Sequence, residues 1–270
     1  MNRKISKTER IAMITKTMIE HPSKLFTLQY FSEMLDCAKS TLSEDIKSIE
    51  ASFEAHDEGK IYSLPGAAGG VYYLPVVSGD YVKATKTELC EKLSDHSRII
   101  PGGYLYMNDI MYDPKWLEKM AYCMVSNYKE AKIDYIVTIE TKGIPLALAV
   151  ARMLNKPIVV IRKEARLTEG TTIQMNYVTG SKHTIKTMAL PIRSIKRGAN
   201  ILFIDDFMKA GGTAKGVIDL MKEFEAKVVG ISVMMSSMTT QKKLVDQYYA
   251  LIDFDGIDEM AKKIFIKAHN

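Results

Sequence analysis

Two adjacent carboxylates followed by a glycine-rich turn are the residues of this chain best suited to chemistry. Asp205 and Asp206 end an apolar run, and Gly211 and Gly212 precede Thr213. Adjacent carboxylates can accept hydrogen bonds from vicinal sugar hydroxyls, and a glycine turn lets backbone N–H groups approach a phosphate. The positive end of a helix expected to begin near Thr213 adds to this attraction. The stretch is therefore a candidate site for a ribose phosphate.

This stretch resembles the 5-phosphoribosyl-1-pyrophosphate (PRPP) motif of type I phosphoribosyltransferases. The resemblance implies that the whole loop binds PRPP, namely Asp205, Asp206, Phe207, Met208, Lys209, Ala210, Gly211, Gly212 and Thr213. Compared with the active enzymes, Lys209 and Ala210 replace an alanine–threonine pair, so one hydroxyl for the 5-phosphate is lost and a cation is gained. The alternative is a strand, turn and helix with incidental acidic residues.

A second turn is expected at the same edge of a parallel sheet. The pattern from Asp134 onward predicts a buried strand at 135–139, a turn at 140–143, a helix at 145–154 and a strand at 157–161. Such units wind right-handedly, and ligands lie at the carboxyl ends of the strands. In phosphoribosyltransferases the first turn holds the pyrophosphate, and Thr141, Lys142 and Gly143 match it. Arg162 and Lys163 end the next strand at this edge, which favours polyphosphate contact.

The remaining elements of this part are expected to support the sheet. Residues 75–83 look like a linker, helices are predicted at 86–97 and 114–128, and strands at 228–236 and 248–254. Residues 164–194 look like a flexible hairpin, where related enzymes carry a lid, with Arg166, Tyr177 and Lys182 as contacts. Tyr104 lies in an irregular segment and could either stack over a ligand ring or fill a core.

The first 74 residues predict a small helical domain with a hairpin. Ser6 and Glu9 have the spacing of a capping box, and Thr27 can cap a second helix. A third helix follows Cys37, and apolar runs at 60–64 and 71–74 flank a glycine-rich turn. Three helices followed by a hairpin is the winged-helix layout, which implies binding of duplex DNA through the third helix.

Small hydroxyl and lysine side chains on the third helix suit contacts to phosphates and base edges. The residues assigned to DNA binding are Arg3, Lys39, Ser40, Thr41, Ser43, Lys47 and, in the hairpin, Lys60. The whole chain carries a net charge of +5; residues 1–74 contain nine Lys or Arg against ten Asp or Glu, which leaves +6 on the rest. This near-neutral head keeps open the alternative of a cap or dimerisation domain.

Composition places the chain among cytoplasmic globular proteins. No apolar run approaches the ~20 residues of a membrane span, and the N-terminus does not resemble a signal peptide. The three cysteines, Cys37, Cys90 and Cys123, are far apart, which favours free thiols in a reducing compartment. We expect no resident metal, no catalytic cofactor and no membrane partner.

Taken together, the two parts resemble the purine operon regulators of Gram-positive bacteria over nearly the whole chain. The matching segments are 101–106, 141–145, 168–170 and 205–213. The resemblance implies an α/β protein with a winged-helix domain at 1–74 and a type I phosphoribosyltransferase-like parallel-sheet domain at 75–270. It further implies a homodimer that binds a paired DNA operator upstream of purine genes and represses them. PRPP would act as an effector that Mg²⁺ could accompany, and no residue would be catalytic.

Two other functions fit parts of the chain. An active purine phosphoribosyltransferase would use the same PRPP site, although a DNA-binding head is superfluous for base salvage. An RNA-binding attenuator fits less well, because a third helix and a wing suit a B-form groove. The residues do not determine repression or activation, the operator sequence, other effector nucleotides, the role of residues 164–194, or whether PRPP acts by competition or by a conformational shift.

Overall fold

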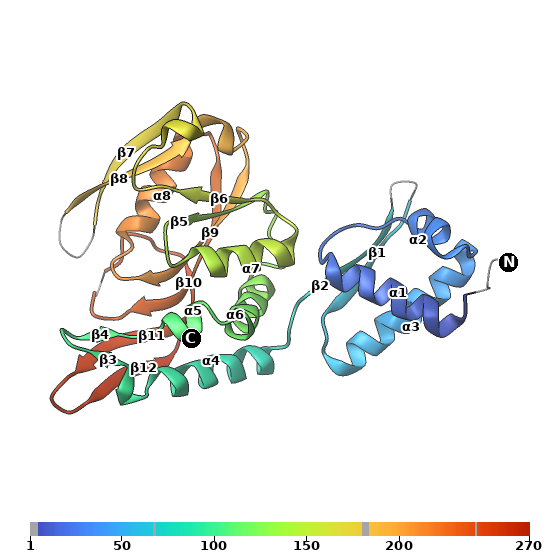
Figure 1. The fold of residues 1–270 in the computed structure, drawn as a ribbon, viewed down its shortest axis with the longest axis horizontal. Helices are drawn as coiled ribbons and strands as arrows, with labels where there is room; N and C mark the ends of the chain where they lie inside the picture. Colours follow the sequence, from blue (N-terminus) through green and yellow to red (C-terminus); the bar gives the residue numbers. More distant parts are fainter. Residues whose placement is uncertain (1–4, 67–68, 180–183, 241) are drawn as a thin grey trace. The chain divides into compact units, whose positions relative to one another are not determined.

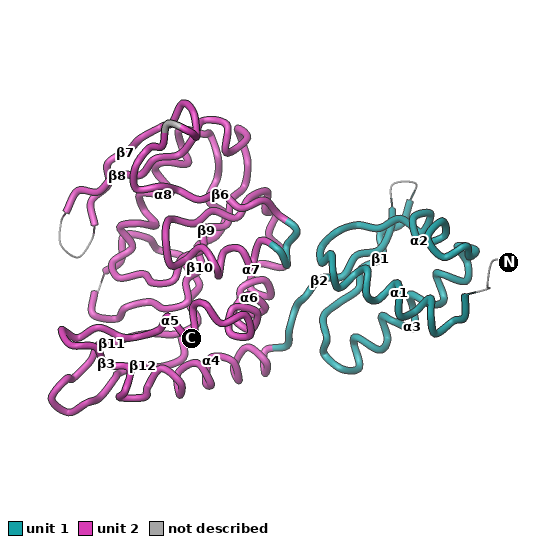
Figure 2. Tube along the Cα trace, viewed as in Figure 1, with its two compact units in different colours: residues 1–78, 152–155 teal, residues 79–151, 156–270 magenta. Residues whose placement is uncertain are grey.

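The computed structural model describes residues 5–66, 69–179, 184–240 and 242–270. The chain forms two compact units (Figure 2), Met1–Ser78 with Arg152–Asn155, and Gly79–Ala151 with Lys156–Asn270. No helix in the described ranges is long and apolar enough to cross a membrane. Arg3 and Lys182, assigned above to DNA and to the lid, lie outside the described residues.

The first unit is a winged-helix fold (Figure 1), built from α1 (Lys7–Glu20), α2 (Leu28–Leu35), α3 (Lys39–His56), β1 (Lys60–Leu64) and β2 (Gly70–Leu74). The predicted capping box is present, since the Ser6 side chain accepts from the Glu9 N–H while the Glu9 carboxylate accepts from the Ser6 N–H. Strands β1 and β2 pair antiparallel, and Phe26 adds a bridge to Val71. The helices and the hairpin thus enclose one small core.

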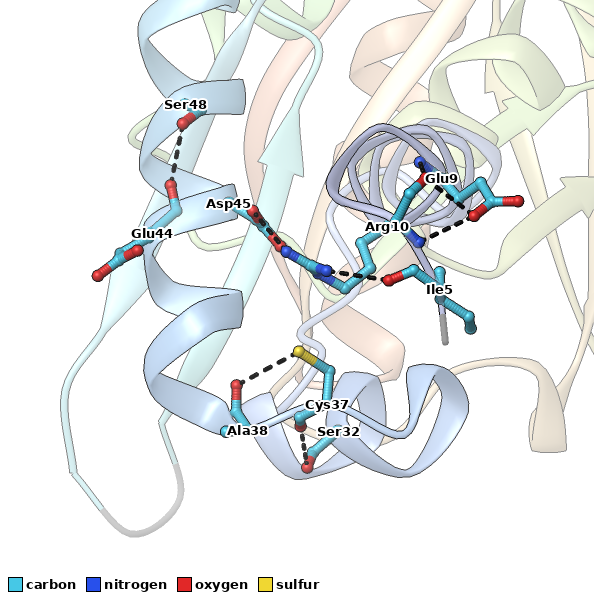
Figure 3. Close-up of polar contacts among 10 residues, drawn as sticks. Ile5, Glu9, Arg10, Ser32, Cys37, Ala38, Glu44, Asp45 and Ser48 are labelled. Carbon is cyan, nitrogen blue, oxygen red and sulfur yellow. Dashed lines mark hydrogen bonds and ion pairs between the residues drawn. The ribbon is translucent and has the colours of Figure 1, made fainter. Parts of the chain in front are cut away.

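A buried ion pair joins α1 to α3 inside this core (Figure 3). Arg10 Nε lies 2.7 Å from Asp45 Oδ2, and Arg10 Nη1 donates to the Ile5 carbonyl at 3.2 Å. The Asp45 side chain is 1% exposed and the Arg10 side chain 12% exposed. The hydrogen bond to Asp45 raises the pKa of Arg10. This pair therefore fixes the first helix against the helix expected to read DNA.

The second unit is built on one six-stranded sheet of order β12-β11-β10-β9-β5-β6. The strands are β5 (Tyr135–Ile139), β6 (Ile158–Ile161), β9 (Asn200–Met208), β10 (Lys227–Ser237), β11 (Tyr249–Asp258) and β12 (Lys263–Ala268). All of these strands except β12 run parallel to one another, as predicted, and β12 pairs antiparallel with β11. Their near-continuous apolar runs reflect burial on both faces of the sheet.

Helices cover this sheet, and the first of them differs from the prediction. The helices are α4 (Gly79–Leu93), α5 (Asn108–Met111), α6 (Pro114–Asn127), α7 (Ile144–Leu154) and α8 (Gly212–Glu223). Helix α4 begins inside the segment predicted as a linker and ends before residue 97, because its buried Thr85, Leu89 and Leu93 pack toward β11 and β12. The irregular segment forms the short pair β3 (Ile99–Ile100) and β4 (Tyr104–Leu105).

The predicted hairpin at 164–194 is present as β7 (Thr172–Val178) and β8 (Ile185–Pro191). It packs on α8, where a Cβ placed on Gly216 would lie 3.0 Å from the Tyr177 ring and 3.1 Å from Met188 Cε. Burial raises the pKa of the Tyr177 phenol, and the Thr213 side chain opposes this shift. The hairpin is therefore held against the first turns of α8.

Candidate ligand site and nucleic-acid interface

The predicted ribose-phosphate loop is the end of β9 and the start of α8. Strand β9 continues through both carboxylates to Met208, so the turn is limited to Lys209–Gly211. Gly211 has φ +79°, a left-handed conformation that side chains rarely adopt. Helix α8 begins at Gly212, and its free N–H groups face the turn. Local sequence therefore accounts for where the turn lies and where α8 begins.

A pocket of about 510 Å³ lies between this loop and the β7–β8 hairpin. It is lined by Thr179, Thr184, Lys186, Phe203, Asp205, Phe207, Met208, Lys209, Ala210, Gly211, Gly212, Thr213, Ala214 and Val233. Lys186 was not predicted from the sequence. It lies on the same face of β8 as the buried Met188 and Leu190, although its own side chain is exposed.

The β5–α7 turn lies against the same carboxylates. A Cβ placed on Gly143 would be 2.8 Å from Asp205 Oδ1 and 2.8 Å from Thr138 Oγ1. The Glu140–Thr141 peptide bond is cis, and the Thr141 and Lys142 side chains are exposed. The structure thus brings Gly143 and Asp205 into contact range, as expected for neighbouring parallel strands.

Arg162 and Lys163, the basic pair that follows β6, have different surroundings. The Arg162 guanidinium lies 3.1 Å from Glu169 Oε1 and 3.5 Å from Glu140 Oε2, so carboxylates already surround it. The Lys163 N–H donates to Glu140 Oε1 at 2.7 Å, while its ammonium partly offsets the burial that raises the pKa of Asp205. Lys163 is therefore the member of the pair whose charge acts on the carboxylate site.

Tyr104 and Arg166 lie outside the pocket lining. The Tyr104 side chain is 66% exposed, so it does not fill a core. It lies beside Gly102, whose added Cβ would be 3.2 Å from the ring. Arg166 is exposed as well. A stacking role for Tyr104 remains a prediction.

The two carboxylates differ in environment. Asp205 is 8% exposed and accepts a hydrogen bond from the Asp206 N–H at 2.9 Å. Burial, followed by the neighbouring charge of Asp206, raises the pKa of Asp205 well above its usual value. Asp206 is half-buried and so more accessible to a ligand.

We expect Asp205→Asn to raise the unfolding temperature at neutral pH. Because burial raises the folded-state pKa, the folded protein holds this proton more tightly than the unfolded chain, and the ionised carboxylate costs stability at high pH. The gain should shrink as pH falls toward ~4, where an unfolded aspartate also protonates. Thermal melts between pH 8 and pH 4.5 measure this. If Asp205→Asn is not more stable than wild type at any pH tested, burial does not penalise the charge of Asp205.

A groove of about 940 Å³ on the winged-helix unit holds several residues assigned to DNA. It is lined by parts of α2, α3 and the hairpin, including Lys39, Ser43, Lys47 and Lys60. Ser40 and Thr41 are not among its lining residues. Glu50 and Glu54 line the same groove. The cations lie nearer the start of α3, so we expect a phosphate backbone to contact that end.

Lys39→Ala and Lys47→Ala are each expected to lower affinity for operator DNA while leaving PRPP affinity unchanged. Each substitution should also reduce the slope of log affinity against log salt by about one. Gel-shift titrations at several salt concentrations test both effects, with the exposed Lys7→Ala as control and Glu50→Gln expected to act in the opposite direction. Normal affinity in both lysine variants would remove α3 from the interface.

The fold and the two sites define a protein with a winged-helix head and a phosphoribosyltransferase-like domain. Residues 6–75 match the family model described as bacterial purine repressor, N-terminal, and residues 114–261 match the phosphoribosyl transferase domain. The chain is 42% identical to the purine biosynthesis transcriptional repressor PurR of Bacillus subtilis, across 99% of this chain and 94% of that protein. It belongs to the PurR family of purine biosynthesis transcriptional regulators.

Other relatives carry different names. The purine biosynthesis transcriptional activator PurR of Lactococcus lactis subsp. lactis is 35% identical over 98% of each chain. A xanthine phosphoribosyltransferase of Lactococcus lactis subsp. cremoris is 32% identical over 52% of this chain and 74% of that enzyme. The adenine phosphoribosyltransferase of Rhodothermus marinus has a similar fold, with a TM-score of 0.54 and 22% identity, over 62% of this chain and 97% of that one. The predicted fold class and family are thereby confirmed.

Proposed function

We propose that this protein is a DNA-binding regulator of purine biosynthesis genes whose activity responds to PRPP. The observation that carries the proposal is the pocket that joins Asp205, the glycine turn and the start of α8. Family membership supports the DNA-binding role, and the cationic end of the groove on α3 supplies its contact surface. Because its proposed partner is DNA, the proposal includes a cytoplasmic location.

PRPP fits the site by the chemistry of its three parts. Asp205 and Asp206 would accept hydrogen bonds from the ribose hydroxyls, and the N–H groups of the turn and of α8 would bind the 5-phosphate. The Thr141–Gly143 turn, which includes Lys142, would bind the diphosphate together with Lys163. Mg²⁺ would accompany PRPP, because it binds through phosphate oxygens together with one or two carboxylates.

A homodimer follows from the same proposal. Regulators with winged-helix or related heads bind paired half-sites through two copies of the head. Relatives named repressor and relatives named activator both match nearly the whole chain, so the direction of regulation depends on more than the family.

The experiment that tests the regulatory role is DNA binding by the full chain. Duplexes carrying a control region from upstream of purine biosynthesis genes are compared with scrambled duplexes of equal length. We expect tighter binding to the control region than to the scrambled duplex. The ratio of the two affinities should stay above one at every salt concentration. Equal affinity for both duplexes would contradict a specific regulator.

Salt dependence separates two routes by which PRPP could act. If the bound polyanion competes with DNA phosphates for the same cations, the slope of log affinity against log salt becomes shallower when PRPP is present. If PRPP instead shifts a conformational equilibrium, the affinity changes and the slope stays the same.

Catalysis is the second candidate function, favoured by the similarity to a xanthine phosphoribosyltransferase. The test is release of pyrophosphate from PRPP with each purine and pyrimidine base. Turnover with any base would establish an enzyme. We expect none, because the close relatives along the whole chain are named as transcription regulators.

A further inference from the structure

The segment between β10 and β11 lies directly behind the ligand loop. The Leu244 N–H donates to the Ala210 carbonyl at 2.9 Å, and Lys243 Nζ donates to the Lys209 carbonyl at 2.9 Å. A Cβ placed on Gly211 would lie 3.3 Å from Leu244 N and 3.2 Å from Val245 Cγ2. Two successive carbonyls of the loop are therefore turned toward residues 243 and 244.

The two carbonyl contacts determine the direction in which the N–H groups of the loop point. In a trans peptide the C=O and the following N–H point in opposite directions. Among the described residues the one cis bond is Glu140–Thr141, so the peptides after Lys209 and Ala210 are trans. The N–H groups of Ala210 and Gly211 consequently point away from residues 243 and 244. The pocket is on that other side, since its lining includes residues 209–213 and neither 243 nor 244.

We propose that Lys243 is a positioning residue, which holds the Lys209–Gly211 turn so that its backbone N–H groups face the phosphate of a ribose phosphate. The left-handed Gly211 matches a backbone nest, in which successive N–H groups converge on an anion. This inference rests on the proposed function, because it assigns the loop to a phosphorylated sugar. It adds a residue that lies 30 positions beyond the motif and outside the pocket lining.

Lys243 is itself firmly placed. Its ammonium also donates to the Ser237 carbonyl at 2.5 Å, at the end of β10, and lies 5.8 Å from the centroid of the Tyr248 ring. Partial burial lowers the pKa of Lys243, and hydrogen bonds from a partly desolvated cation are strong.

Loss of this cation would release the peptide after Lys209. Its carbonyl could then rotate toward the pocket and present a negative dipole where the phosphate binds. If Lys243 had a purely structural role, it would only hold the segment between β10 and β11 against the sheet through Ser237. Its loss would then lower the stability of the fold more than the affinity for any one ligand.

Calorimetric titration of the full chain distinguishes these roles with three probes: ribose 5-phosphate, PRPP and inorganic pyrophosphate. We expect Lys243→Met to weaken ribose 5-phosphate and PRPP by about tenfold and to leave pyrophosphate affinity unchanged, because the turn at Thr141–Gly143 is not held by Lys243. Lys243→Arg, which keeps a cation and several donors, should recover most of the lost affinity. Lys242→Met removes the exposed neighbouring charge and should behave as wild type.

Three results would overturn the inference: unchanged ribose 5-phosphate affinity in Lys243→Met, an equal loss for all three probes with a lowered unfolding temperature, or the same loss in Lys242→Met. Failure of the proposed function would give a different result, in which wild-type protein binds ribose 5-phosphate and does not bind PRPP. The dependence of ribose 5-phosphate binding on Lys243 would still be measured in that case.

Discussion

Arg10→Met is expected to unfold the winged-helix unit at a much lower temperature and to abolish DNA binding. The substitution leaves the Asp45 carboxylate in the core, 1% exposed, without its partner. Removal of one member of a buried ion pair is strongly destabilising, because the remaining charge is neither hydrated nor compensated. We expect the melting transition of this unit to fall by ~10 °C or more. Scanning calorimetry of the full chain measures it.

Two control variants show whether the pair is responsible. Arg10→Met combined with Asp45→Leu removes both charges and should recover most of the stability. Lys16→Met breaks an exposed pair with Glu20 and should change little. PRPP affinity should be normal in all three, since the ligand pocket is built from the other unit. A single Arg10→Met variant that melts like wild type would contradict the role of the pair.

Asp205→Ala and Asp206→Ala are each expected to weaken PRPP binding by about tenfold or more, since hydrogen bonds to charged groups contribute ~1.5–3 kcal/mol. The fold should survive, because the carboxylates lie near the end of β9 and leave its apolar residues in place. Calorimetric titration with PRPP measures the loss, with the exposed Asp255→Ala as the matched control. Undiminished affinity in both variants would contradict the ligand site and the sensor role with it.

The parts of the fold that sequence predicted well are those determined by neighbours along the chain. The capping box at Ser6, the buried run of β9 and the glycine turn before α8 each depend on a few consecutive residues. The start of α4 was missed because Gly79 and Asp80 are residue types typical of turns, whereas the helix as a whole packs against the distant strands β11 and β12. The antiparallel β12 was missed for the same reason, since its pairing with β11 is not encoded in its own pattern.

The Arg10–Asp45 pair was also missed, although a signal was available. Arg10 lies four residues before the buried Ile14, and Asp45 lies between Leu42 and Ile49 on the buried stripe of α3. Opposite charges that interrupt two facing apolar stripes indicate a buried pair. Lys243 offered no such signal, because its contact with Lys209 is made by a backbone carbonyl of a distant loop.

The most direct test of the central claim is the dissociation constant for operator DNA measured with and without saturating PRPP, in wild type and in Asp206→Ala. A coupling free energy of ~1–3 kcal/mol would change the wild-type constant by ~5- to 150-fold. We expect a change within that range in wild type, and unaltered DNA affinity that no longer responds to PRPP in Asp206→Ala. A wild-type dissociation constant that is the same with and without PRPP would contradict the account.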